Sequence, residues 1–245
     1  MLIVSGDVPA SEEGSMRVSM ARSYGTSAVA VERPRSMFVH IVVLLIVMLV
    51  ISPACAGPIK MVVLGDSLSA GLGLSAPDAF PAQLQKALKD KGIDINIVNA
   101  GVSGDTASGG RDRLDWSVAE GTEAVVLELG ANDALRGTDP AVTRAALTDI
   151  VSRLKARGIA VLMCGMLAPP NYGHDYADRF NAIYPDIAKS FDVTLYPFFL
   201  DGVAADKTLN QADGIHPTPA GVDIIVKKML PTVEAFLDTI KGKGH

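Results

Sequence analysis

The sequence is poor in cysteine, histidine and aromatic residues, and each shortage excludes a class of protein. Its 245 residues include two cysteines, four histidines and one tryptophan, and aromatic residues make up 5%. Two cysteines cannot build the disulfide framework that stabilises small secreted scaffolds. The net charge is −5 and basic residues do not cluster, which argues against a nucleic-acid partner. We therefore expect a fold that is stabilised by an ordinary hydrophobic core.

The sequence also lacks an apolar run that would cross a bilayer comfortably. The longest run, 37–51, is interrupted only by His40 and falls short of the roughly 18 to 20 apolar residues that a spanning helix needs. It is typical of the apolar part of a secretory signal, because the small residues Ala54-Cys55-Ala56 follow it. We expect cleavage after Ala56 and a periplasmic or secreted protein. An uncleaved membrane anchor is the alternative, and acylation of Cys55 as a lipoprotein is disfavoured because the preceding residues make a poor lipobox.

The remaining chain, 57–245, is expected to be a single domain, with 1–56 as an N-terminal extension and signal. Its length suits one domain, and no low-complexity linker divides it. We expect a monomer whose membrane contact is limited to the signal segment or a lipid substrate.

Apolar runs alternate with segments of helical period along this domain. Strands are expected at 60–64, 95–98, 124–129, 160–164 and 194–197, and helices at 80–91, 142–157 and 219–241. Such alternation is typical of βαβ units. The sequence predicts an α/β fold, a three-layer α/β/α sandwich around a flavodoxin-like, five-stranded parallel sheet.

Ligand sites in such sheets lie beyond the carboxyl ends of the strands. The first of these loops follows the strand in "MVVLGDSLSAG", which sets Ser67 between Gly65 and Gly71. Two interpretations compete: the turn exposes Ser67 as a nucleophile, or its backbone amides bind a phosphate. Asp66 is expected to brace the loop by hydrogen bonds, and both glycines to leave clearance for a substrate carbonyl.

A serine nucleophile needs a base, and His216 is the best candidate. Asp213 precedes it by three residues in a loop constrained by glycine and proline, which lets the carboxylate orient one imidazole nitrogen. His174 lies in a predicted loop, "NYGHDY", without an upstream acid at a useful spacing, and it is expected at the surface.

Acyl transfer also needs donors for a developing oxyanion. Gly104 has no Cβ and could present a backbone amide, and Asn132 brings a side-chain amide just past a strand. Alone, each residue is more often simple turn chemistry. Their appearance after successive strands is the informative feature.

The motifs Gly65-Asp66-Ser67-Leu68, Gly104 in "SGD", "GAND" at 130–133 and "DGIHP" at 213–217 occur in this order. Together they resemble the blocks of the GDSL or SGNH hydrolase superfamily, over nearly all of residues 57–245. The resemblance is greatest to the bacterial periplasmic thioesterase, lysophospholipase and arylesterase subgroup. Ala131 departs from that subgroup, which often has a second glycine there.

The resemblance implies a serine hydrolase that cleaves acyl or aryl esters or thioesters through an acyl-enzyme. It implies Ser67 as nucleophile, His216 as base and Asp213 as the orienting acid, with an oxyanion hole formed by Ser67 N–H, Gly104 N–H and the Asn132 side chain. It implies no metal and no organic cofactor.

Apolar residues near these motifs are candidates for a substrate pocket. They are Leu72, Leu135, Met166, Pro169 and Tyr172. Packing against the core would explain them equally well.

Three alternatives remain beside this hypothesis. A carbohydrate O-acetylesterase would use the same fold and triad, although its site should be more polar. A non-catalytic flavodoxin-like protein that binds a phosphate or nucleotide would leave Asp213, His216 and Asn132 without a role. Cys164 as nucleophile is disfavoured, because it lies within an apolar strand where cysteine usually packs as a small hydrophobe.

Overall fold

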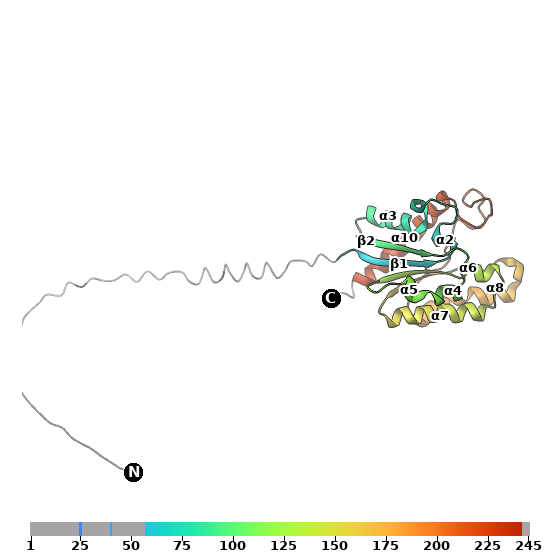
Figure 1. Cartoon of the computed structure of the whole chain (residues 1–245), viewed down its shortest axis with the longest axis horizontal. Coiled ribbons are helices and arrows are strands. Elements are labelled where there is room, and N and C mark those ends of the chain that lie inside the picture. The colour runs from blue at the N-terminus through green and yellow to red at the C-terminus, as the bar shows by residue number, and fades with distance from the viewer. Residues whose placement is uncertain (1–24, 26–39, 41–56, 242–245) are drawn as a thin grey trace, which may run out of the picture. The chain divides into compact units, whose positions relative to one another are not determined.

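The computed structural model describes Gly25, His40 and residues 57–241 of the chain. Figure 1 shows the compact domain that these C-terminal residues form. Apart from His40, the expected signal segment lies outside the described residues, as do Ala56 before the expected cleavage site and the last four residues.

The domain is built on a five-stranded, fully parallel sheet. Its strands are β1 (Ile59–Gly65), β2 (Ile95–Gly101), β3 (Ala124–Glu128), β4 (Ala160–Cys164) and β5 (Thr194–Tyr196). Their spatial order is β2-β1-β3-β4-β5, which is the flavodoxin-like order. The predicted sheet is confirmed, and four of its strands differ from the expected bounds by one to three residues at an end.

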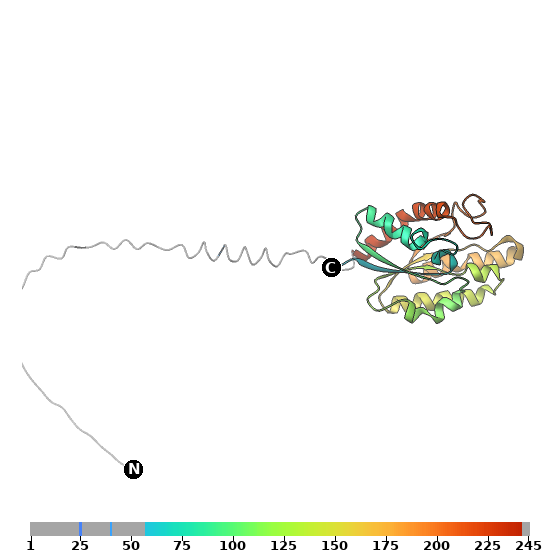
Figure 2. The ribbon, with the colours of Figure 1, turned by 45° about the horizontal axis from the view of Figure 1, so that its top comes forward.

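Helices cover both faces of this sheet, as Figures 1 and 2 show. On one face α3 (Phe80–Asp90) packs against α10 (Pro219–Lys241). On the other face α7 (Pro140–Ala156) packs against α4 (Ala107–Asp112) and α9 (Ile183–Phe191). Two further helices, α5 (Leu114–Ser117) and α8 (His174–Asn181), complete this layer. The three-layer sandwich expected from the sequence is therefore confirmed.

The core lies between the sheet and the helices. All five residues of β3 are buried, because helices cover both faces of this central strand. The apolar stripe of α7 faces the sheet, and its residues Leu147, Ile150, Val151 and Leu154 are fully buried. The helices expected at 80–91 and 142–157 end at Gly92 and Gly158, both with positive φ, as helix caps of this type require.

The helices that the sequence did not predict include α4, α8 and α9. α4 contains Gly109 and Gly110, which have low helix propensity. Pro185 interrupts the pattern of α9, but it lies in the first turn, where proline removes no hydrogen bond of the helix. Local sequence therefore underestimated helices that tertiary packing stabilises.

Gly130 connects β3 to the loop that carries Asn132, and no other residue type fits at this position. Its φ is 115°, and a Cβ built on it would lie 2.2 Å from Tyr184 Oη. The same hydroxyl donates a hydrogen bond of 3.0 Å to the carbonyl of Leu129. Backbone conformation and packing thus both require glycine at this turn.

We expect Gly130→Ala to destabilise the domain more than Gly158→Ala does. Gly158 has a φ of 73° but open space around it, so alanine there incurs only the backbone penalty, about 1 to 2 kcal/mol. Alanine at 130 adds a clash with a buried tyrosine, for a total of several kcal/mol. Urea unfolding of both variants measures the difference, and equal losses would contradict the close approach of Tyr184.

Candidate active site

Ser67 lies at the carboxyl end of β1, as the first residue of the short helix α2 (Ser67–Ala70). The preceding residue, Asp66, caps this helix, because its Oδ1 accepts a hydrogen bond of 2.9 Å from Leu68 N–H. Its Oδ2 accepts from Asn132 Nδ2 at 3.1 Å. The prediction that Asp66 braces the loop is therefore confirmed, and the bond to Asn132 extends the brace to a second loop.

His216 and Asp213 form a continuous hydrogen-bonded chain with Ser67. His216 Nε2 lies 2.8 Å from Ser67 Oγ, and His216 Nδ1 lies 2.7 Å from Asp213 Oδ2. Asp213 Oδ1 also accepts from the N–H groups of Ile215 and His216, at 2.9 and 3.0 Å. These backbone bonds are the main reason that the pKa of Asp213 falls to about 2. The carboxylate is ionised at neutral pH and fixes the orientation of the imidazole.

Gln211 holds this histidine loop against the serine loop, a role that was not predicted from the sequence. Its N–H donates to His216 O at 2.7 Å. Its side-chain amide donates to Leu72 O at 2.7 Å and to Pro217 O at 3.0 Å. A glutamine outside any motif gives no signal of this kind in the sequence.

The three candidate oxyanion donors come from three neighbouring loops. The N–H groups of Ser67 and Gly104 donate no hydrogen bond within residues 57–241. The side-chain amide of Asn132 is engaged with Asp66 and also with the Asp105 carbonyl, at 2.9 Å. An oxyanion would therefore find two free backbone donors and would have to share the amide of Asn132.

Arg136 is exposed and also bonds to this region. Its Nη2 donates to Gly104 O at 3.0 Å. Gly104 itself has a φ of 82°. The arginine therefore helps to hold the Gly104 peptide in a conformation that favours glycine. His174 is exposed, as expected, but it begins α8 and does not lie in a loop.

The expected role of Gly65 and Gly71 as clearance for a substrate carbonyl is wrong. A Cβ on Gly65 would lie 2.2 Å from Ser69 Oγ and 2.7 Å from Glu128 Oε2. A Cβ on Gly71 would lie 2.6 Å from the Cβ of Ala79. Both glycines make room for packing inside the domain.

Glu128 is a fully buried carboxyl behind the serine loop, and its role was not predicted from the sequence. Its Oε2 accepts from Ser69 Oγ at 2.7 Å and from Asp66 N–H at 3.3 Å. Its Oε1 has no hydrogen-bond partner among the residues that the structure describes. Burial, and then the charge of Asp66, raise the pKa of Glu128 well above its ordinary value. An acid at the end of an apolar strand was the available signal in the sequence.

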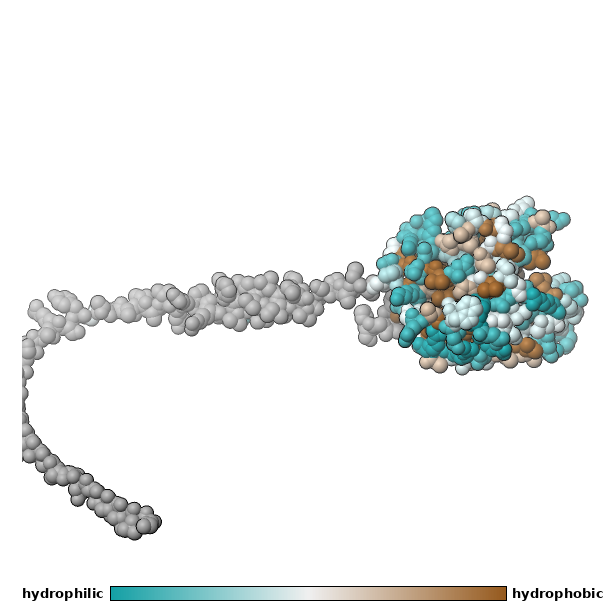
Figure 3. All heavy atoms as spheres, in the orientation of Figure 1, coloured by the Kyte–Doolittle hydropathy of each residue, from teal (hydrophilic) through white to brown (hydrophobic). Residues whose placement is uncertain are grey.

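A cavity of about 490 Å³ opens beside Ser67 and His216. Three of the expected pocket residues, Leu135, Met166 and Pro169, line it. Leu72 and Tyr172 do not line it. Leu72 lies in the loop after α2 and is about half exposed, and the Tyr172 hydroxyl donates a hydrogen bond to the carbonyl of Leu135. In Figure 3, apolar residues lie on both sides of an indentation at the edge of the domain where Figure 1 labels α6 (Ala131–Leu135).

The segment after β5 also contributes to this lining, which was not predicted from the sequence. Its lining residues are Phe198, Leu200, Ala204 and Ala205. The apolar run "PFFL" beyond the fifth strand, at the same edge of the sheet, was the available signal.

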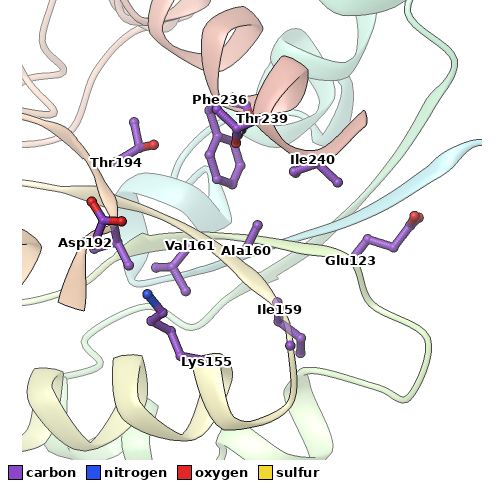
Figure 4. Close-up of a pocket in the computed structure, with 12 residues that line it drawn as sticks. Glu123, Lys155, Ile159, Ala160, Val161, Asp192, Thr194, Phe236, Thr239 and Ile240 are labelled. Carbon is purple, nitrogen blue, oxygen red and sulfur yellow. Dashed lines mark hydrogen bonds between the residues drawn. The ribbon is translucent and has the colours of Figure 1, made fainter. Parts of the chain in front are cut away.

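A second cavity, of about 350 Å³, lies at the opposite edge of the sheet (Figure 4). It is lined by the amino ends of β4 and β5 and the last turns of α7 and α10, with Glu123, Lys155 and Asp192 as its charged residues. No serine or cysteine lines it. No histidine lines it either, so its threonine hydroxyls lack a base of the kind that His216 offers to Ser67.

No group of three or more metal-ligating side chains occurs among the residues that the structure describes. Cys164 is buried in β4, and burial raises the pKa of its thiol well above the ordinary value. A thiol that stays protonated is a poor nucleophile, which agrees with the expectation that Cys164 packs as a hydrophobe.

A serine, a histidine and an aspartate in one hydrogen-bonded chain, at the carboxyl edge of a parallel sheet, are typical of a serine hydrolase. The model of the GDSL-like lipase/acylhydrolase family matches residues 63–224. The chain belongs to this family, and it is a hydrolase that acts on ester bonds.

Known proteins resemble the chain over most of their own length. An esterase TesA of Pseudomonas aeruginosa is 43% identical over 72% of this chain and 89% of its own. A thioesterase 1/protease 1/lysophospholipase L1 of Escherichia coli is 39% identical over 79% and 93%. A crystal structure of TesA has a TM-score of 0.69 at 42% identity, and it covers 72% of this chain and 99% of that one. The esterase EstA from Pseudoalteromonas has a TM-score of 0.70 at 30% identity, with 74% and 99% covered.

The buried carboxyl of Asp66 predicts a pH dependence of stability. Burial raises its pKa from 3.8 to about 6, so the folded state binds this proton more tightly than the unfolded chain does. The stability that it contributes is fully present below pH 3.8 and is lost as the pH rises through about 6, up to about 3 kcal/mol. We expect urea unfolding of Asp66→Asn, between pH 4 and 7, to lack this component. Equal pH slopes in the variant and the parent would contradict the raised pKa.

Proposed function

We propose that Ser67 is the nucleophile of this ester hydrolase. His216 Nε2, 2.8 Å from Ser67 Oγ, takes the serine proton as Oγ attacks the acyl carbon. Ionised Asp213 stabilises the imidazolium that forms. His216 then returns the proton to the leaving alcohol or thiol, and water repeats the sequence on the acyl-enzyme. The unbroken Ser67–His216–Asp213 hydrogen-bond chain is the single observation on which this proposal rests.

The tetrahedral intermediate needs donors for its negative oxygen. We assign this role to the N–H groups of Ser67 and Gly104 and to the side-chain amide of Asn132. Two of these N–H groups make no other hydrogen bond within residues 57–241, so they are available to the oxygen. The side-chain amide of Asn132 would be shared with Asp66 or Asp105 when the oxyanion forms. Donors that are already oriented cost no reorganisation at the moment of reaction.

The cavity beside Ser67 favours an acyl or aryl group as the part of the substrate that it receives. Its lining is largely aliphatic, with Phe198 as its aromatic residue. An acetylated sugar would instead need polar groups around the site, so the carbohydrate O-acetylesterase alternative has less support. The proposed substrates are small acyl or aryl esters and thioesters.

We also propose that the chain is exported and cleaved after Ala56. The described domain agrees with this position, because β1 begins at Ile59 and cleavage would remove no residue of the sheet. None of the helices within the described residues is long and apolar enough to cross a membrane.

A hydrolysis panel on the 57–245 protein tests the proposed substrates. It contains aryl esters of increasing acyl length, an acyl-CoA, a lysophospholipid and an acetylated sugar. We expect turnover of the aryl or acyl esters in preference to the acetylated sugar. Ser67→Ala should lower kcat by about 10⁴-fold or more and leave the unfolding free energy within about 1 kcal/mol.

The matched control for this panel is Ser190→Ala. Ser190 is exposed and its hydroxyl bonds only to Asp186 O in the last turns of α9, so this variant should retain full activity. Normal turnover by Ser67→Ala would rule out Ser67 as the nucleophile. Turnover of the acetylated sugar alone would overturn the assigned substrate class.

Export is tested by expressing the full chain and sequencing the amino terminus of the exported protein. We expect it to start at Gly57, with the catalytic activity in the exported fraction. A mature chain that retains residues 37–51 would indicate the membrane-anchor alternative.

A further inference from the structure

One buried guanidinium bonds to the loops on which the proposed site is built. The side chain of Arg113, the C-cap residue of α4, is only 9% exposed. Its Nη2 donates to Gly65 O at 2.8 Å, and its Nη1 donates to Ala100 O at 2.8 Å and to Ser117 Oγ at 3.0 Å. Its Nε donates to Asp105 Oδ2 at 2.7 Å. The charge therefore has a carboxylate and three further acceptors.

These acceptors adjoin the donors assigned to the oxyanion. Gly65 lies two residues before Ser67 in the chain, and its carbonyl also accepts the N–H of Val102, in the loop after β2. Asp105 directly follows Gly104, and the Asp105 carbonyl accepts from the Asn132 side chain at 2.9 Å. The guanidinium thus joins the end of β1 to the Gly104 loop directly, and to Asn132 through one further hydrogen bond.

The local packing of α4 leaves room for this ion pair. A Cβ on Gly109 would lie 1.9 Å from Asp105 Oδ1, so any larger residue would displace the carboxylate. Glycine inside a helix costs about 1 kcal/mol relative to alanine. Glycine at position 109 therefore leaves the space that the Asp105 carboxylate occupies when it bonds to Arg113.

We propose that Arg113 is a positioning residue that fixes the Ser67 and Gly104 N–H groups relative to each other and holds Asn132 through Asp105. This inference rests on the proposed function. Arg113 does not line the cavity beside Ser67, so it acts through these loops and not on the substrate. A planar guanidinium can hold several acceptors at fixed angles, which a lysine ammonium cannot reproduce.

The test compares Arg113→Lys with Arg153→Lys. Arg153 belongs to α7, pairs with Asp115 at 2.7 Å and does not line the cavity beside Ser67. A misplacement of about 1 Å in a catalytic group costs about 100-fold in rate. We expect Arg113→Lys to lower kcat by about 10- to 100-fold with KM nearly unchanged. The rate at which an organophosphonate labels Ser67 should fall in parallel. Arg153→Lys should change neither quantity.

A double-mutant cycle with Asn132→Ala separates positioning from general destabilisation. If Arg113 acts through the oxyanion donors, its substitution costs less in the Asn132→Ala background than in the parent protein, because part of the arrangement is already lost. Asp105→Asn, which keeps the backbone carbonyl for Asn132, is the second variant should Arg113→Lys fail to fold. The same loss in kcat is then expected.

Two results would overturn the proposal. The first is an equal kcat for Arg113→Lys and Arg153→Lys under conditions where both variants are folded. The second is a loss in kcat that is strictly additive for Arg113→Lys and Asn132→Ala in the cycle. For the second variant, an unchanged kcat would do the same. Failure of the proposed function is distinct, because it would appear as turnover by Ser67→Ala, whatever the residue at position 113.

Discussion

The position of β1 between β2 and β3 in a parallel sheet is the constraint on which the site depends. Because all strands run in one direction, the loops after β1, β2 and β3 leave the sheet at the same edge. Gly65 is in register with Gly101 of β2 and with Glu128 of β3. Ser67, Gly104 and Asn132 therefore come close although 65 residues separate the first from the last.

Hydrogen bonds to buried charged or polar side chains turn this proximity into a defined geometry. Asp66 ties the serine turn to Asn132, and Arg113 ties the end of β1 to the Gly104 loop. Burying such groups is costly unless they are paired. The two acids at the back of the serine turn illustrate this cost, since burial raises the pKa of both Asp66 and Glu128. Part of the stability of the domain is thus given up to hold these loops in place.

Much of the fold could be predicted because its elements are locally encoded. Apolar runs mark the five strands, and the stripe of Leu147, Ile150, Val151 and Leu154 marks α7. The helices α8 and α9 were missed because prolines and a glycine conceal helices that are stabilised by packing. The residues brought near Ser67 were predictable because each belongs to a short motif after a strand.

The supporting residues could not be found in the same way. Arg113, Glu128 and Gln211 belong to no motif, and each has a partner that lies at least 48 residues away in the sequence. Gly65 was assigned to the wrong role, because the sequence cannot tell which neighbour would meet a Cβ. Such contacts depend on how strands and loops pack, which no local pattern reports.

The crystal structure of an organophosphonate adduct tests the central claim most directly, because the phosphonyl oxygen occupies the place of the oxyanion. The account predicts a covalent bond to Ser67 Oγ. It also predicts that the oxygen lies about 2.7 to 3.1 Å from the nitrogen atoms of Ser67 N–H, Gly104 N–H and the Asn132 side chain. An adduct on another residue, or a phosphonyl oxygen that faces solvent away from these donors, would contradict it.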